Sequence, residues 1–291
     1  MVTPDTLGGK FIAWAHREPS IRALVLIGSQ SRPAADAAPA DRFSDWDFQV
    51  VSSCPALFAE RTWTRAAGLP DPIVHAARLG RLKRTGKVTA VFPDGDLDLV
   101  LLPARSLGLA KAAFQLGLGG WLARRQPALG DLALVLGFGL RVVKGGAGWE
   151  DFFRRVVAEV PPTHVDDREV VALAEGFAAD YLSTWQKIER GEWLAAQRWL
   201  HVQLAETNFR LMHEWKRRRG GARASYPDAR RVEKLYDAAE QAAVAVRATL
   251  DRESLARAVE HSAQTCREIV AALVGGAWRW PEGLALRLSR E

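Results

Sequence analysis

The sequence predicts an α+β fold, in which a mixed sheet with flanking helices precedes a C-terminal helical bundle. Short runs rich in β-branched residues, each bounded by Gly, Pro or Asp, occupy the first hundred residues. Beyond about Gly148 this pattern disappears, and long segments with a helical period take its place. Glycines cluster just before that point. We therefore expect two domains, residues 1–148 and residues 149–291.

Local patterns of apolar and turn-forming residues define the expected elements. A helical period over residues 7–18 ends before Pro19, because proline disrupts a continuing helix. The run RALVLI stops at Gly28-Ser29, which is typical of a buried strand, and Pro93-Asp94-Gly95 predicts the turn of a hairpin. The expected strands are residues 22–27, 45–51, 84–92 and 96–102, and the expected C-terminal helical segments are residues 165–219, 228–250 and 253–274.

Several features indicate a cytoplasmic protein without a membrane segment. The longest apolar stretch, residues 132–143, is interrupted by two glycines and an arginine and is too short to span a bilayer. The first ten residues lack the pattern of a signal peptide. The two cysteines, Cys54 and Cys266, form no CxxC pattern, which excludes a disulfide framework and fits a reducing compartment. Cys54, directly after the second strand, is expected to be a small buried hydrophobe.

Charge is unevenly distributed along the chain. The formal net charge is +6, but residues 150–214 carry 12 acidic and 7 basic residues, which leaves +11 on the rest. An enzyme that binds a triphosphate on one part and a cationic acceptor on another would have this distribution. Uneven surface charge without functional meaning is the alternative interpretation.

The most informative residues are three carboxylates. Asp45 and Asp47 open the second strand, and residues two apart in a strand project to the same face. Asp98 begins a later strand, so all three converge if the two strands are neighbours. Like charges held this close are unfavourable unless a cation such as Mg²⁺ neutralises them. The alternative is that Asp45 and Asp47 only make an edge strand soluble.

Such a cluster suits in-line attack on a phosphorus atom, with two metal ions assisting the attacking and the leaving oxygen. Gly28 would allow close approach of the backbone to phosphates, and Ser29 would offer a hydroxyl and an N–H at a helix N-terminus. Arg32 is placed to contact phosphate oxygens. The sequence therefore predicts Gly28, Ser29 and Arg32 as nucleotide-binding residues.

The ordered set IGSQSR…SDWDFQVV…DLDLVLL resembles the nucleotidyltransferase superfamily typified by DNA polymerase beta. In order, length and helical second half it is most similar to the aminoglycoside 6-adenylyltransferases, which modify streptomycin. Lys187–Glu192 and Arg210–Trp215 resemble that family's Arg-Gly-Glu segment and its Arg-x-x-x-Glu-Trp helix. The resemblance spans roughly residues 5 to 240.

The resemblance implies transfer of AMP from ATP, the co-substrate, to a hydroxyl of an aminoglycoside, with release of pyrophosphate. By matching position, Asp45, Asp47 and Asp98 would be catalytic and hold Mg²⁺. Asp98 is the first candidate for the base that deprotonates the acceptor hydroxyl. Antibiotic resistance is the associated role of the family, and the sequence does not define an oligomeric state.

Residues of the helical half could bind the cationic acceptor. If one helix continues through Gly191, then Trp185, Glu189 and Glu192 share a stripe with Trp199. Carboxylates pair with ammonium groups, and aromatic rings attract cations. An ordinary solvated helix face with half-buried tryptophans is the alternative interpretation.

Two other functions remain open from the sequence. A nucleotidyltransferase that modifies RNA or protein would agree with the positive charge outside residues 150–214. The absence of aromatic and basic residues interleaved as in RNA-binding modules argues against a nucleic-acid partner. A nucleotide sensor without catalysis is the third function, but a pure binder would not need three carboxylates.

Overall fold

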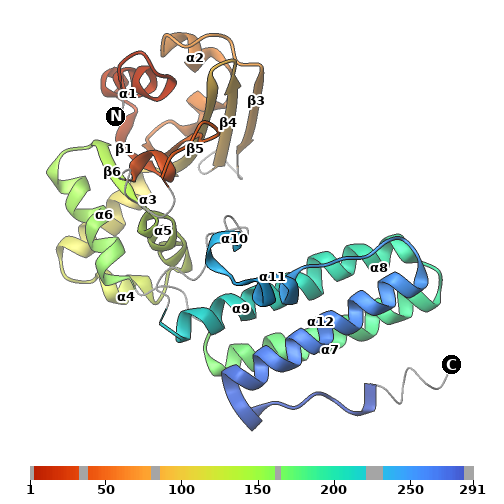
Figure 1. Cartoon of the computed structure of the whole chain (residues 1–291). Coiled ribbons are helices and arrows are strands. Elements are labelled where there is room, and N and C mark those ends of the chain that lie inside the picture. The colour runs from red at the N-terminus through yellow and green to blue at the C-terminus, as the bar shows by residue number, and fades with distance from the viewer. Residues whose placement is uncertain (1–2, 33–38, 80–85, 161–164, 221–231, 285–291) are drawn as a thin grey trace. The chain divides into compact units, whose positions relative to one another are not determined.

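A computed structural model describes residues 3–32, 39–79, 86–160, 165–220 and 232–284. The chain divides into two compact units, Met1–Thr163 and His164–Glu291 (Figure 1). The first unit contains a sheet with helices, and the second is built from helices. The predicted fold class is therefore confirmed.

A six-stranded sheet forms the centre of the first unit. Its strands are arranged in the order β3-β4-β5-β2-β1-β6. Strands β2 and β5 pair in parallel, whereas the other neighbours pair antiparallel. The strands are β1 (Ile21–Ile27), β2 (Trp46–Ser52), β3 (Val74–Leu79), β4 (Gly86–Phe92), β5 (Gly95–Pro103) and β6 (Leu140–Lys144).

Helices cover both faces of this sheet. On one face, α1 (Leu7–Arg17) and α2 (Thr62–Ala66) bury an aromatic cluster in which the rings of Phe11, Phe48 and Trp63 are in contact. On the other face, side chains of β1 and β6 pack with four helices. These helices are α3 (Ala104–Gln115), α4 (Gly119–Ala123), α5 (Pro127–Gly137) and α6 (Ala147–Glu159).

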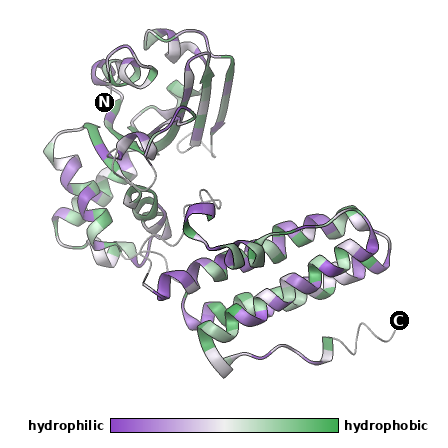
Figure 2. Cartoon of the chain, in the orientation of Figure 1, coloured by the Kyte–Doolittle hydropathy of each residue, from purple (hydrophilic) through white to green (hydrophobic). Residues whose placement is uncertain are grey.

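The second unit is an amphipathic helical bundle, whose helices carry both hydrophilic and hydrophobic residues along their lengths (Figure 2). The long helices α7 (Asp167–Glu189) and α12 (Arg252–Val274) lie side by side (Figure 1). Between them in sequence come α8 (Trp193–Trp199), a π-helix over Leu200–Ala205, α9 (Glu206–Arg218), α10 (Val232–Leu235) and α11 (Ala238–Val244). Their apolar faces form one buried cluster.

Three features differ from the sequence-based expectations. Strands β3 and β6 had no counterpart among the expected strands; they are the two edges of the sheet, where one side of a strand has no neighbour. The helical segment expected over residues 165–219 is interrupted at Gly191, whose φ of 73° is left-handed. The compact units divide after residue 163 rather than after residue 148, because α6 buries Phe152, Phe153 and Val156 in the cluster of the first unit.

Candidate active site

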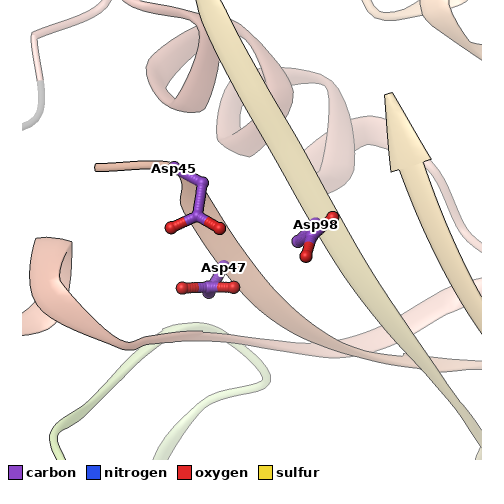
Figure 3. A group of neighbouring side chains, drawn as sticks. All are labelled: Asp45, Asp47 and Asp98. Atoms are coloured by element: carbon purple, nitrogen blue, oxygen red, sulfur yellow. The ribbon is translucent and has the colours of Figure 1, made fainter. Parts of the chain in front are cut away.

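Three carboxylates gather where β2 and β5 run in parallel. Asp47 of β2 lies directly opposite Asp98 of β5, and Asp45 immediately precedes β2. One carboxylate oxygen from each residue lies within 4.8 Å of the others. Figure 3 shows the three side chains grouped across the two strands. All three are partly exposed, so a cation could reach them from solvent.

The neighbouring strand β4 holds the carboxylate of Asp98. Thr89 is opposite Asp98 in the antiparallel pair of β4 and β5, and its hydroxyl donates a hydrogen bond of 2.6 Å to Oδ1. Lys87, two residues earlier on the same face, places its Nζ 2.5 Å from Oδ2. Both oxygens of Asp98 therefore have partners from β4.

Asp96 is a fourth carboxylate that sequence reasoning did not select. It lies on β5 two residues before Asp98, so both project to the same face of the sheet. Burial raises the pKa of Asp96, and the nearby carboxylates of Asp45 and Asp98 raise it further. This is the electrostatic result expected where negative charge accumulates. The strand motif Asp-x-Asp at residues 96–98 was the signal that could have identified it.

Gly28 forms the wall of the cluster on the side of β1. Its φ of 69° is left-handed, and a β-carbon at this position would stand 2.4 Å from Oδ2 of Asp47. Ser29 begins a single 3₁₀ turn, Ser29–Ser31, whose last hydroxyl donates to the carbonyl of Gly28. The expected helix N-terminus at Ser29 is therefore only this short turn.

Arg32 follows the turn and has a structural contact in addition to its predicted phosphate contact. Its Nε donates a hydrogen bond of 2.6 Å to the carbonyl oxygen of Phe138, just before β6. The backbone of Gly139 passes close by, since a β-carbon there would be 2.6 Å from the Ser31 hydroxyl. Arg32 thus links the turn after β1 to the segment that precedes the edge strand β6.

The residues predicted to bind the acceptor lie in the second unit, and they do not form one helical stripe. The chain turns at Gly191, so Trp185 and Glu189 belong to α7, whereas Glu192 precedes α8. Glu189 pairs with Arg252 of α12 at 2.7 Å, and Glu192 is exposed. The stripe was wrong because it assumed that the helix continues through a glycine which adopts a left-handed conformation.

Residues 1–104 match the family model described as streptomycin adenylyltransferase. The match covers about a third of the chain and includes Gly28, the three carboxylates and Lys87; it ends before the helical unit. Over this region the chain is similar to that family. No curated protein matches the chain.

Two solved structures are similar over most of the chain. An aminoglycoside 6-adenyltransferase from Bacillus subtilis is 13% identical, with 99% of this chain and 98% of that chain covered and a TM-score of 0.41. A nucleotidyltransferase-like protein from Exiguobacterium sibiricum is 12% identical, with 94% and 76% covered and a TM-score of 0.33. Likenesses this weak carry no argument about activity.

Among the described helices, none is long and apolar enough to cross a membrane.

Proposed function

We propose that this chain, whose N-terminal region matches the streptomycin adenylyltransferase family, transfers AMP from ATP to a hydroxyl of a cationic, aminoglycoside-like acceptor and releases pyrophosphate. The observation that carries the proposal is the gathering of Asp45, Asp47 and Asp98 within 4.8 Å, against the backbone of Gly28. A cluster of this kind has no evident structural purpose, because mutual repulsion of carboxylates is destabilising.

Mg²⁺ is the cation that suits this cluster best. Carboxylate oxygens are the ligands that Mg²⁺ prefers, and all three residues offer one from two adjacent strands. When bound, the metal would supply Lewis-acid stabilisation of the negative charge that develops on phosphate oxygens. Asp45, Asp47 and Asp98 would hold it.

The nucleotide would lie on the β1 side of the cluster. Gly28 has no side chain there, so a phosphate can approach the backbone next to Asp47. Ser29 supplies a hydroxyl and an N–H at the start of its 3₁₀ turn, and Arg32 supplies positive charge. These three residues would orient the triphosphate, with the α-phosphorus directed at the carboxylates.

The acceptor hydroxyl would then attack from the opposite side. In-line transfer places the attacking and leaving oxygens on opposite sides of the phosphorus, which puts the acceptor on the side of β5. A bond forms between the acceptor oxygen and the α-phosphorus, while the bond from the α-phosphorus to the pyrophosphate oxygen breaks. Asp98 or its neighbour Asp96 would take the proton that the hydroxyl loses.

The helical unit is the proposed source of acceptor contacts. Residues 165–214 of this unit carry more acidic than basic residues, which would attract an acceptor bearing ammonium or guanidinium groups. Trp185, Glu189 and Glu192 remain the proposed contacts, although Glu189 would have to exchange Arg252 for the ligand. A guanidinium group of the ligand can replace that of Arg252 at Glu189, because both groups are planar cations of the same shape.

The decisive experiment measures pyrophosphate release with ATP and Mg²⁺ over a panel of streptomycin, other aminoglycosides and tRNA. Turnover with an aminoglycoside that is lost in Asp47→Asn would support the proposal. Asp94→Asn is the matched control, because Asp94 is an exposed residue of the β4–β5 turn outside the carboxylate cluster. Turnover with tRNA alone would replace the acceptor class, and nucleotide binding without turnover on any acceptor would support a sensor.

A further inference from the structure

Lys87 of β4 forms an ion pair with one carboxylate of the acidic cluster. Its Nζ lies 2.5 Å from Oδ2 of Asp98, and the side chain is 52% exposed, whereas that of Asp98 is 14% exposed. The lysine thus reaches from solvent to a carboxylate that is largely enclosed. Neither the family match nor the sequence motifs gave Lys87 a role.

The pairing is set by the register of the hairpin. Lys87 lies opposite Val100, and Thr89 opposite Asp98, so both side chains project to the face that carries the carboxylates. Thr89 fixes Oδ1 through its hydroxyl, which leaves Oδ2 directed at the lysine. Asp98 is therefore held in one orientation, with one oxygen neutralised by a single positive charge.

Lys87 supplies one positive charge at Asp98, beside further carboxylates. Asp45, Asp47 and Asp98 lie together, and Asp96 lies on β5 two residues before Asp98, on the same face of the sheet. A divalent cation that binds this cluster would also bind the carboxylate of Asp98, which already holds the ammonium group. An ammonium group and a divalent cation repel each other at such separations, so the two compete for the carboxylate of Asp98.

We propose that Lys87 is a resident counter-cation of the acidic cluster, which occupies Asp98 in the metal-free protein and lowers the affinity of the site for a divalent cation. This inference rests on the proposed function, because it assumes that the cluster binds metal. Lys87 suits the role because its long side chain can withdraw to solvent when a metal arrives, at little energetic cost.

The test is Mn²⁺ binding to the full-length, nucleotide-free protein, followed by the electron paramagnetic resonance signal of free Mn²⁺ at one pH and one ionic strength. Lys87→Met removes the competing charge and is expected to tighten Mn²⁺ binding by about three- to tenfold. Lys87→Arg keeps a cation on Asp98 and is expected to bind Mn²⁺ as weakly as the wild type or more weakly. If Lys87→Met does not fold, as judged by circular dichroism, Lys87→Gln replaces it.

Two controls separate local competition from a general change in charge. Lys10→Met removes one positive charge from the exposed side of α1, which covers the other face of the sheet, and it is expected to leave binding unchanged. In the Asp98→Asn background, Lys87→Met is expected to have no effect, because the carboxylate for which the lysine and the metal compete is gone. Three results would overturn the inference. Lys10→Met could increase the affinity for Mn²⁺ as much as Lys87→Met does, or Lys87→Met could leave the affinity unchanged or weaken it. The third result is that Lys87→Met still increases the affinity in the Asp98→Asn background.

Failure of the proposed function gives a different result. If the wild type does not bind Mn²⁺, or if Asp47→Asn binds it as tightly as the wild type, the proposed metal site is wrong. The proposed role of Lys87 is then wrong as well. If such binding exists but Lys87→Met does not tighten it, only the role of Lys87 is overturned.

Discussion

The backbone of Gly28 lies so close to the carboxylate of Asp47 that a β-carbon would stand 2.4 Å from Oδ2. Gly28 also adopts φ 69° and ψ −156°, a conformation that is almost restricted to glycine. Two independent requirements, space and backbone conformation, therefore select glycine at the end of β1. The position of Asp47 in the cluster depends on both.

Gly28→Ala is expected to reduce nucleotidyl transfer by about a hundredfold or more, because the added methyl group displaces Asp47 from the cluster. The backbone strain should also lower the free energy of unfolding by roughly 1–3 kcal/mol. Steady-state pyrophosphate release and urea unfolding measure the two effects. Gly68→Ala is the matched control: its φ is also +69°, but nothing lies within 4 Å of its added β-carbon. Comparable loss of activity in both variants would contradict this explanation.

Removal of metal is expected to lower the thermal stability of the first unit. A cation that binds only the folded protein at a concentration a hundred times its Kd stabilises it by about 2.7 kcal/mol. For a unit of this size that corresponds to roughly 5–10 °C in Tm. Differential scanning fluorimetry with Mg²⁺ and with chelator measures the difference. Asp45→Asn should abolish the effect of Mg²⁺ on Tm and slightly raise the Tm of the protein in chelator, since one repelling charge is gone. A wild-type Tm that does not change with Mg²⁺ would contradict the metal site.

Glu214 is expected to stabilise the helical unit in a pH-dependent manner. Its side chain is 2% exposed. Burial tends to raise its pKa, but hydrogen bonds and charge from Arg217 and Arg218 outweigh this and hold the pKa at about 2, below the ordinary 4.5. The stabilisation is therefore complete above pH 4.5 and is lost as the pH falls towards 2. The shift corresponds to roughly 3 kcal/mol.

Glu214→Gln should accordingly unfold at lower urea concentration at pH 7, with a weaker loss of stability between pH 4.5 and pH 2 than the wild type. Circular dichroism at a series of pH values measures both. Glu253→Gln on α12 is the matched control, because Glu253 is 84% exposed and its i,i+4 pair with Arg257 should contribute little. Equal effects of the two substitutions would show that burial of Glu214 does not matter.

The two cysteines are expected to differ sharply in reactivity. Cys54 is exposed, which contradicts its predicted burial, because it follows the end of β2 in a surface turn. Cys266 is fully buried on α12, and burial raises the pKa of its thiol to about 12. A thiol reagent should modify one cysteine in the native protein and two in guanidinium chloride. Cys54→Ser should abolish the native reaction; fast labelling that persists in this variant would mean that Cys266 is accessible.

Elements with a strong local pattern could be predicted from the sequence. Helix α1 begins at Leu7, after the N-cap Thr6, whose hydroxyl accepts a hydrogen bond from the N–H of Gly9, and it ends just before Pro19 as expected. The strand RALVLI is buried on both faces, so almost every residue is apolar. Strand β3, VHAARL, is an edge strand with partly exposed side chains, so its sequence lacks such a run and it was missed.

The sequence by itself determined that Asp45 and Asp47 share a face, since alternation along a strand is a local property. The sequence also predicted Gly28 as the residue whose missing side chain leaves room for the close approach of a phosphate. Only the tertiary structure decided that β5 runs parallel to β2, which brings Asp98 opposite Asp47, and that β4 delivers Lys87 to Asp98. The physical reason is that strand pairing joins residues far apart in the chain, and its register follows from the packing of the whole sheet rather than from any local pattern.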